Sequence, residues 1–218
     1  MKNKIFFPKK MNSDLAEEIG LHLGDGSMNY YNGKGLYQLR GHITDDKSHY
    51  IIRIKPLYKS LFNIDIRLRD MHSTGVHGFQ IWSNALVDYK HNFLGLPLGP
   101  KHDFLVPNTI TNNDEFSKSF LRGFFDTDGC LYLENRRGNL YPRIEMVSIS
   151  ERFIKQLKEI IFRLGFRVTY EKRDNLPRHK FAIHKLSIRG KTMTRKWFFE
   201  IKSNNPKHVN KFRKLSLE

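Results

Sequence analysis

Apolar side chains recur at spacings of three and four residues in two segments of the chain, 48–62 and 151–164. This spacing lines up the apolar positions on one face of a helix. The offset of 103 residues pairs Tyr50 with Phe153, Ile51 with Ile154, Ile54 with Leu157, Leu57 with Ile160 and Leu61 with Leu164. A stripe repeated in register predicts two homologous halves that arose by duplication. We place them at 1–103 and 104–218.

The order of patterns predicts the same elements in each half: helix, strand, strand, helix, strand, strand, helix. Period-two alternation around a turn such as Asn32-Gly33 is typical of a β-hairpin. Each half is therefore expected to be an α/β (α+β) unit, whose four-stranded antiparallel sheet has one face for helices and one left open. We expect helices at 14–25, 48–62, 84–93, 114–128, 151–164 and 191–201, and strands within 27–44, 65–82, 130–148 and 167–189.

Residues that favour helix N-termini precede the first helix of each half. Ser13 or Asp14 can cap the first, and Asn113 or Asp114 the second. Glu17 follows Asp14 at the spacing of a capping box, so we predict that these two residues cap the helix together.

Polar and apolar side chains alternate along the predicted strands. In "YQLRGHI", Gln38, Arg40 and His42 point away from Leu39 and Ile43. An open face rich in Arg and Gln can follow the major groove of DNA, where Arg pairs with guanine and Gln with adenine. For any one of these residues, a phosphate contact or simple solvation is an equal alternative. The other side chains expected on this face are Arg67, Arg69, Gln80, Arg143, Lys185 and Arg189.

Composition and charge narrow the class of partner. Thirty-eight Lys and Arg against 22 Asp and Glu give a net charge of +16, which predicts a polyanionic partner, most commonly nucleic acid. The basic tail, 205–218, is expected to add phosphate contacts or to form a last short helix. A single cysteine, Cys130, excludes an internal disulfide and a Cys-based zinc cluster. No apolar run approaches the roughly 20 residues that span a membrane, so we expect a soluble, cytoplasmic protein.

Two acids stand at the C-terminal ends of the apolar first helices. Asp25 and Asp128 are 103 residues apart, and each is followed by glycine. The partial negative charge of a helix C-terminus disfavours an acid by about 0.3–1 kcal/mol. If the two helices pack together, their ends converge, and two carboxylates then need a shared cation; ligation by oxygen alone suits Mg²⁺. The small residues that would let the helix backbones touch are Gly20, Gly24, Gly123 and Thr127.

The residues at this point resemble a known family. "IGLHLGDGS" (19–27) and "LRGFFDTDGC" (121–130) are similar to the motif of the LAGLIDADG homing endonucleases, in the single-chain form with two motif copies. "GLPLGPKHDFLVPNTI" (95–110) is similar to the segment that connects the copies. The resemblance covers about 15–212. It implies two halves related by a pseudo-two-fold axis, with sheets that form a DNA-binding saddle, and an archaeal or bacterial host rather than an organelle.

The resemblance also implies roles for the motif residues. Asp25 and Asp128 would bind metal ions that serve one DNA strand each, with Gly24 and Thr127 beside them in the metal site. The cofactor would be Mg²⁺, with Mn²⁺ as a substitute. Asp126 lies where the family's motif usually packs or caps.

A catalytic lysine is implied by the same resemblance, just after the second strand, and we assign it to Lys47. The offset of 103 maps Lys47 onto Ser150, so the second half departs from the pattern. Either Lys185 or Lys101 serves that side, or the two strands are cut at unequal rates. Lys101 belongs to a "PKH" stretch that recurs at 206–208. Asp46 is expected to cap a helix, with a role in orienting water as the alternative.

The function implied is that of a monomeric, Mg²⁺-dependent, site-specific double-strand DNA endonuclease that leaves 3′ overhangs and spreads its own intron. Two alternatives remain: an RNA-binding maturase that acts on its host intron, and a DNA-binding regulator with inactive sites. The presence of both motif acids argues against the regulator, whereas RNA binding would not require them.

Overall fold

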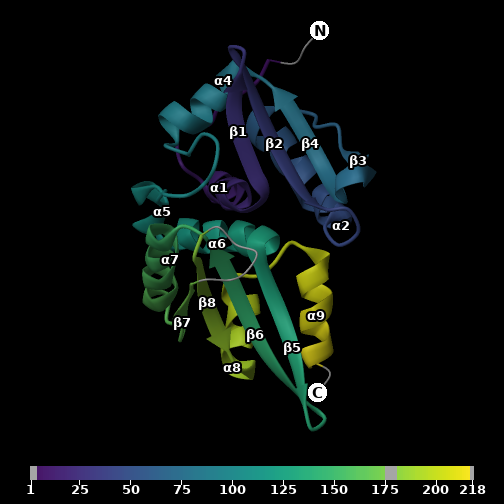
Figure 1. Ribbon diagram of the computed structural model, residues 1–218, viewed down its shortest axis with the longest axis vertical. Coiled ribbons are helices and arrows are strands. Elements are labelled where there is room, and N and C mark those ends of the chain that lie inside the picture. Colours follow the sequence, from purple (N-terminus) through teal and green to yellow (C-terminus); the bar gives the residue numbers. More distant parts are fainter. Residues whose placement is uncertain (1–3, 175–180, 217–218) are drawn as a thin grey trace.

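The computed structural model describes residues 4–174 and 181–216, and it is built from two halves with the same order of elements (Figure 1). This confirms the predicted duplication and the α+β class. The predicted boundary at residue 103 lies in the connection 94–107 and stays a prediction. The first half contains α1 (Ser13–Asp25), β1 (Gly26–Tyr31), β2 (Lys34–His42), α2 (Lys47–His49), η1 (Tyr50–Ile54), α3 (Lys55–Phe62), β3 (Arg69–Met71), η2 (His72–Thr74), β4 (Val76–Trp82), α4 (Asn84–Asp88) and η3 (Tyr89–Phe93). The second contains α5 (Asn108–Thr111), α6 (Asp114–Asp128), β5 (Gly129–Arg136), β6 (Asn139–Ser148), α7 (Glu151–Arg163), β7 (Thr169–Arg173), β8 (Ile183–Arg189), α8 (Lys191–Glu200) and α9 (Pro206–Ser216).

Each half has one four-stranded antiparallel sheet, in the order β1-β2-β4-β3 and β5-β6-β8-β7. Tight turns set the register of the two hairpins: Asn32 and Gly33 have φ of 49° and 75°, and Arg137 and Gly138 have φ of 51° and 85°. Positive φ at both central residues is the type I′ geometry that matches the twist of the flanking strands.

Helices α1 and α6 lie side by side across the middle of the molecule, between the two sheets (Figure 1). Their backbones touch where glycine leaves room. A Cβ on Gly20 would lie 2.2 Å from the Phe120 carbonyl oxygen, and one on Gly123 would lie 2.1 Å from that of Glu17. The predicted contact of the two helices through their small residues is therefore confirmed.

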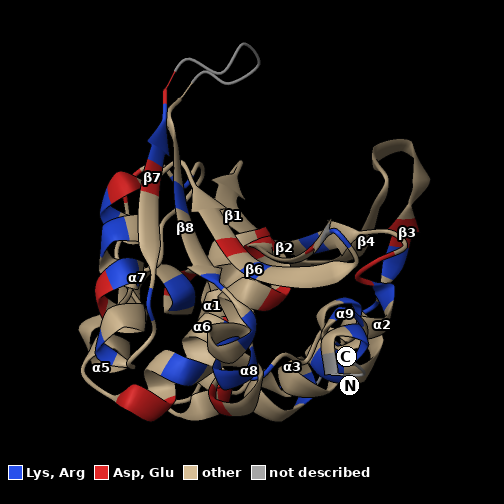
Figure 2. Cartoon of the chain, turned by 90° about the horizontal axis from the view of Figure 1, so that it is seen from below, with Lys and Arg blue, Asp and Glu red and all other residues tan. Residues whose placement is uncertain are grey.

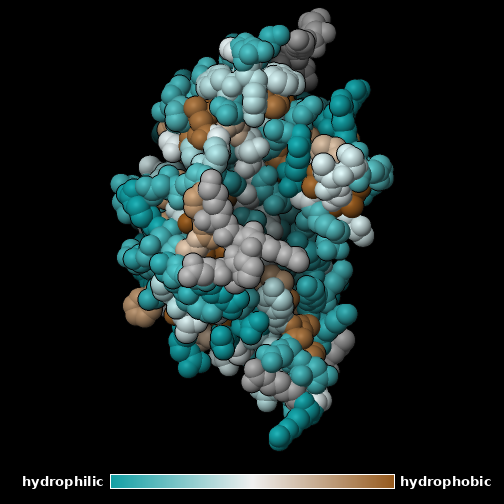
Figure 3. All heavy atoms as spheres, in the orientation of Figure 1, coloured by the Kyte–Doolittle hydropathy of each residue, from teal (hydrophilic) through white to brown (hydrophobic). Residues whose placement is uncertain are grey.

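The sheets lie on one side of the molecule and most helices on the other (Figure 2). On β2, Tyr37 and Leu39 are buried against the helices, while Gln38 and Arg40 alternate toward the open side. The open side seen in Figure 1 is mostly hydrophilic, with scattered hydrophobic residues (Figure 3). In the described part of the chain, no helix is long and apolar enough to cross a membrane.

Three local predictions were wrong. Helix α1 is capped by Asn12, whose side chain accepts from the Leu15 N–H at 2.8 Å, and Glu17 makes no capping box. The π-helical turn η1 rotates the stripe of the second helix, so Ile51 is 51% exposed where its counterpart Ile154 is buried. Arg67 precedes β3 instead of lying on a strand.

Candidate active site

The two motif acids lie at the touching ends of α1 and α6. A Cβ on Gly24 would meet Thr127 Oγ1 at 2.0 Å and the Asp128 backbone nitrogen at 3.5 Å. The residues before the two acids are thus packed against each other, and β1 and β5 leave the helix ends directly afterwards. The sequence-predicted convergence of Asp25 and Asp128 follows from this packing.

The electrostatics of the pair are unfavourable without added positive charge. Burial, together with the negative charges of Asp128 and Asp46, raises the pKa of Asp25 to about 8. Asp128 has an exposed surface, but the surrounding protein displaces much of its solvent, and this desolvation raises its pKa as well. In both cases Lys101 and Lys207 act in the opposite direction. The raised pKa values mean that the ionised form of both carboxylates is disfavoured, and a bound cation would offset this.

Lys101 closes the end of the first motif helix. Its ammonium donates to the carbonyl oxygens of Leu23, at 2.7 Å, and of Gly24, and it lies 3.3 Å from that of His22. Burial lowers the pKa of Lys101, while Asp128 and Asp25 raise it. The lysine thus neutralises the negative end of α1 and faces both acids.

Lys207 is the counterpart of Lys101 in the second half. Its ammonium donates to Asp46 Oδ1 at 2.8 Å, and Asn205 donates to the same oxygen at 2.8 Å and to the Asp126 carbonyl at 2.9 Å. Burial alone would raise the pKa of Asp46, but Lys207, Asn205 and the His42 N–H together lower it below its usual value. Asp46 stands at the N-cap of α2, but its side chain makes no capping bond there, so the capping prediction was wrong.

Lys47, the predicted catalytic lysine, is held elsewhere. Its ammonium lies 2.7 Å from Asp70 Oδ2, and it is not among the main charges acting on Asp25 or Asp128. Its equivalent Ser150 caps α7. The structure therefore brings Lys101 and Lys207 to the acids in place of Lys47, and a catalytic role of Lys47 stays a prediction.

The remaining predicted metal-site residues are already engaged through other atoms. The Gly24 carbonyl accepts from Lys101, and the Thr127 hydroxyl donates within α6 to the carbonyls of Gly123, at 3.1 Å, and Phe124, at 3.0 Å. Among the described residues, no group of three or more His, Cys, Asp or Glu side chains could hold a metal ion. Any metal here would rely on the two motif acids together with ligands from outside the chain.

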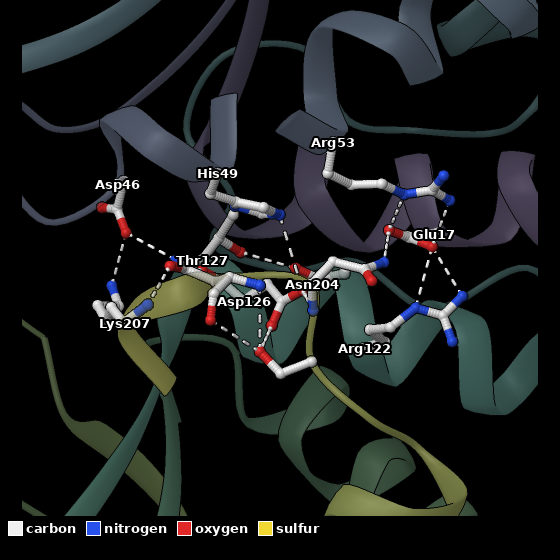
Figure 4. A network of polar contacts seen from close by, with 12 residues as sticks. Glu17, Asp46, His49, Arg53, Arg122, Asp126, Thr127, Asn204 and Lys207 are labelled. Carbon is white, nitrogen blue, oxygen red and sulfur yellow. Dashed lines mark hydrogen bonds and ion pairs between the residues drawn. The ribbon is translucent and has the colours of Figure 1, made fainter. Parts of the chain in front are cut away.

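Asp126 is a structural residue beneath the site. It is buried, accepts from the Ser203 hydroxyl at 2.5 Å and from the Asn204 N–H at 2.8 Å, and lies 3.7 Å from His49 Nε2 (Figure 4). Burial raises its pKa to about 7 and lowers that of His49 to about 4. These contacts tie the segment before α9 to α6, as expected for a motif position that packs.

Glu17 joins the halves on the other side of the same network (Figure 4). Its carboxylate accepts from Arg53 of the first half at 2.8 Å, from Arg122 of α6 at 2.7 Å, and from Asn204 at 2.8 Å. Burial alone would raise its pKa, but the two guanidinium groups lower it below the usual value. The carboxylate is therefore ionised in the folded protein.

The predicted DNA contacts are divided between the two open sheet faces. Gln38, Arg40, His42, Arg69 and Gln80 belong to strands of the first sheet, and Arg143, Lys185 and Arg189 to the second. Gln38 is cross-strand neighbour to Gln80. Lys185 is buried, with 6% exposed, and Arg67 is exposed outside the strands.

Comparison with known families and structures identifies the fold. A family model described as a LAGLIDADG-like domain matches residues 115–202. The homing endonuclease I-DmoI in complex with DNA and Mn superposes with a TM-score of 0.60 at 17% identity, over 87% of this chain and 96% of that one. For the LAGLIDADG meganuclease I-AabMI bound to uncleaved DNA the values are 0.52 and 11%, over 91% and 87%. The N-terminal LAGLIDADG domain of DUF199/WhiA gives 0.54 and 14%, over 87% and 80%.

A curated relative is of a different kind. Glutamine–fructose-6-phosphate aminotransferase (isomerizing) of Methanocaldococcus jannaschii is 23% identical over 190 residues, which are 87% of this chain. The chain matches only 16% of that protein's length. The match does not carry the aminotransferase activity to this chain.

Proposed function

We propose that the chain is a site-specific double-strand DNA endonuclease that uses divalent metal ions, in keeping with the LAGLIDADG-like domain matched at 115–202 and with the fold it shares with I-DmoI. The observation that carries the proposal is the pair of acids at the packed ends of α1 and α6, with Lys101 and Lys207 facing them. Cleavage on both strands by one chain, with staggered 3′ ends, is part of the same proposal.

The donor set fits a hard divalent cation. Asp25 and Asp128 offer carboxylate oxygens, and burial raises the pKa of both, with the charge of Asp128 adding to the shift at Asp25. A bound cation would favour the ionised form of both carboxylates. When bound, such ions would hold the scissile phosphates, activate water and stabilise the leaving oxygen. Structures of I-DmoI, which shares the fold, are described as complexes with DNA and Mn or Ca. We propose Mg²⁺ as the ion, with Mn²⁺ as a substitute.

The two lysines would stabilise negative charge rather than transfer protons. Lys101 is fixed by the end of α1 and is drawn toward both acids, so its ammonium offsets the charge that accumulates when a phosphate enters. Lys207 occupies the corresponding place but shares its charge with Asp46.

The open sheet faces would hold the DNA. They lie on the same side of the molecule and carry the cationic and amide side chains expected to contact the grooves. The net charge of +16 would favour association with the phosphate backbone.

A DNA-binding regulator is the second candidate. The N-terminal LAGLIDADG domain of WhiA has the same fold, and its name is not that of an endonuclease. Intron RNA as a partner, the monomeric state, a mobile intron as host and a cytoplasmic location stay predictions.

The test is cleavage of a plasmid library with randomised sites in Mg²⁺ by the wild type, Asp25→Asn and Asp128→Asn. We expect linear product from the wild type and none from either variant. Asp65→Asn, which removes an exposed acid remote from the motifs, serves as the control and should cut normally. A wild type that binds DNA but cuts in neither Mg²⁺ nor Mn²⁺ would leave the regulator as the better reading.

A further inference from the structure

The open faces of the two sheets differ in charge. On the first sheet, the strands β1 to β4 are described in full and place no Asp or Glu on the open face. On the second sheet, Glu145 and Glu171 share the open face with Arg143, Lys185 and Arg173. The colouring of Figure 2 shows acidic and basic residues together on β7. The two faces therefore offer DNA different chemistry.

The duplication defines which positions correspond. Gly26 pairs with Leu39 at the start of the first hairpin, and Gly129 pairs with Met146 at the start of the second. The residue before each partner is Gln38 in one half and Glu145 in the other. Gln38 and Glu145 each lie opposite the second residue after a motif acid, so they occupy equivalent places on the two open faces.

Glu145 is the centre of an ion-pair network. Its Oε1 accepts from the Lys185 ammonium at 3.2 Å and from the Ser187 hydroxyl at 3.3 Å, and lies 2.8 Å from Arg143 Nε without the alignment of a hydrogen bond. Lys185 in turn lies 2.8 Å from Glu171. The contacts of Glu145 among the described residues all use Oε1, and 11% of its side chain is exposed. Its Oε2 is the acceptor that remains for a ligand on the open face.

Gln38 presents the opposite situation. Its Oε1 is buried and has no hydrogen-bond partner among the described residues. An unpaired buried oxygen is unfavourable, and a ligand that donates a hydrogen bond to it would remove that penalty.

We propose that Glu145 is a specificity-determining residue that selects cytosine in the half of the DNA target bound by the second sheet. The position related to it by the pseudo-symmetry is read by Gln38 as adenine. An ionised carboxylate only accepts, so it suits the amino group of cytosine and is repelled by the N7 and O6 acceptors of guanine. An amide donates and accepts, and pairs with N6 and N7 of adenine. The target is therefore asymmetric at this pair of positions. This proposal rests on the proposed DNA-binding function.

The ion-pair network around Glu145 strengthens the discrimination between cytosine and the other bases. Lys185 and Arg143 are occupied by carboxylates and are not free to bind guanine or phosphate at the same place. The half-buried carboxylate also disfavours any base that presents only acceptors, because little solvent remains to relieve the repulsion.

The experiment is selection of bound duplexes from a fully randomised pool in Ca²⁺, followed by sequencing, for the wild type, Glu145→Gln and Gln38→Glu. The wild type should recover one half-site with cytosine and the other with adenine at the related positions. Glu145→Gln should change that cytosine to adenine, and Gln38→Glu should change that adenine to cytosine. We expect a change of about tenfold in base preference at one position for each variant.

The control and the opposing results are distinct. Glu171→Gln removes an equal charge from the rim of the same face and should raise affinity without moving any base preference. If Glu145→Gln leaves the selected sequence unchanged, or weakens all positions evenly, Glu145 only supports the sheet and the proposal fails. Should Glu145→Gln not fold, Gln38→Glu decides alone, since Gln38 takes part in no ion pair. A wild type that enriches no sequence refutes sequence-specific DNA binding itself.

Discussion

Asp25 makes metal binding depend on pH. Its pKa of about 8 means that a proton competes with a divalent ion below that pH. We predict that the affinity for Mn²⁺, measured by titration calorimetry without DNA, rises about tenfold per pH unit up to about pH 8 and then levels off. The rise should be much flatter in Asp25→Asn. An affinity independent of pH in the wild type would contradict the assignment of Asp25 as a ligand.

The raised pKa of Asp25 also makes the stability of the folded protein depend on pH. Because the folded state holds the Asp25 proton more tightly than the unfolded chain, this group favours folding most below its ordinary pKa of 3.8. The contribution is lost as the pH rises toward 8. A bound cation would offset the cost of ionising Asp25 in the folded state, which links metal binding to stability in neutral solution.

Lys101 and Lys47 can be separated by matched substitutions. Lys101 faces both acids, whereas Lys47 is paired with Asp70 on the surface. We predict that Lys101→Met slows single-turnover cleavage by about 10²–10³-fold, and that Lys47→Met cuts at nearly the wild-type rate. DNA binding in Ca²⁺, measured alongside, should remain within a few fold for both. The reverse pattern of rates would restore Lys47 as the catalytic lysine.

At the residue level, the sequence was informative where the chemistry is local. The position of Asp25 and Asp128 at the touching helix ends could be predicted because each directly ends a helix whose small face is visible in the sequence, while their role as metal ligands stays a prediction. Lys101 was only an alternative, since it reaches α1 from a distant loop. The repeat of "PKH" at 100–102 and 206–208 was the signal that could have identified both lysines. The capping-box prediction for Glu17 was wrong because a glutamate near the start of a helix can serve either in a cap or in a buried ion pair.

At the level of elements, the contact of α1 with α6 depends on two glycines. A methyl group on Gly20 or Gly123 would press on a carbonyl oxygen of the facing backbone, which has no rotamer to change. We predict that Gly20→Ala and Gly123→Ala each lower the free energy of unfolding by about 1–3 kcal/mol or more, measured by urea denaturation. Lys118→Ala, which removes a half-buried lysine paired with the exposed Glu115 on α6, should change it by less than about 0.5 kcal/mol. Unchanged stability in both glycine variants would mean that the helices do not pack this way.

The elements themselves could be read from periodicity almost throughout. Helix α6 has the predicted bounds, and the first hairpin turns at Asn32-Gly33 as expected. The π-helical turn Tyr50–Ile54 could not be predicted, because one extra residue in a turn leaves the apolar spacing nearly unchanged. Strand β3 is shorter than its alternation suggested, since backbone pairing with β4 decides where a strand begins.

At the scale of the whole molecule, Glu17 holds the halves together. It is buried and accepts from Arg53 of one half and Arg122 of the other. Removing one partner from a buried pair costs about 3–5 kcal/mol. We predict a loss of about 3 kcal/mol in the unfolding free energy of Glu17→Gln at neutral pH. Because the pKa of Glu17 is lowered, its contribution is present above its ordinary pKa of 4.5 and is lost as the pH falls through the folded value.

The difference between wild type and Glu17→Gln should therefore shrink in acid. Lys55 and Asp65, an exposed pair 3.5 Å apart, provide the comparison, and Asp65→Asn should change stability little at any pH. A difference that stays constant as the pH falls below about 4 would show that the charge of Glu17 is not what stabilises the interface.

The pseudo-symmetry is broken at the active site. Lys207 is paired with Asp46, while the position that corresponds to Asp46 in the second half is Ile149, so Lys101 meets no such carboxylate. Among the described residues, Lys101 is thus held by backbone carbonyls and by no carboxylate, whereas Lys207 is partly neutralised by Asp46. Two sites of unequal charge would act on their two strands at unequal rates.

We predict that the wild type accumulates nicked plasmid before linear product, with first and second cuts that differ in rate by about tenfold, which corresponds to about 1.4 kcal/mol. Asp46→Asn keeps one acceptor oxygen, which can still accept from the His42 N–H, but it removes the negative charge paired with Lys207, so the nicked species should be shorter-lived. Asp45→Asn, which removes an exposed acid at the adjacent position, should leave the time course unchanged. The measurement is a time course of supercoiled, nicked and linear DNA in Mg²⁺. Direct conversion of supercoiled to linear DNA by the wild type would mean that Asp46 does not distinguish the two sites. If the nicked species persists equally in Asp46→Asn, the difference in cutting rate comes from the two half-sites of the DNA instead.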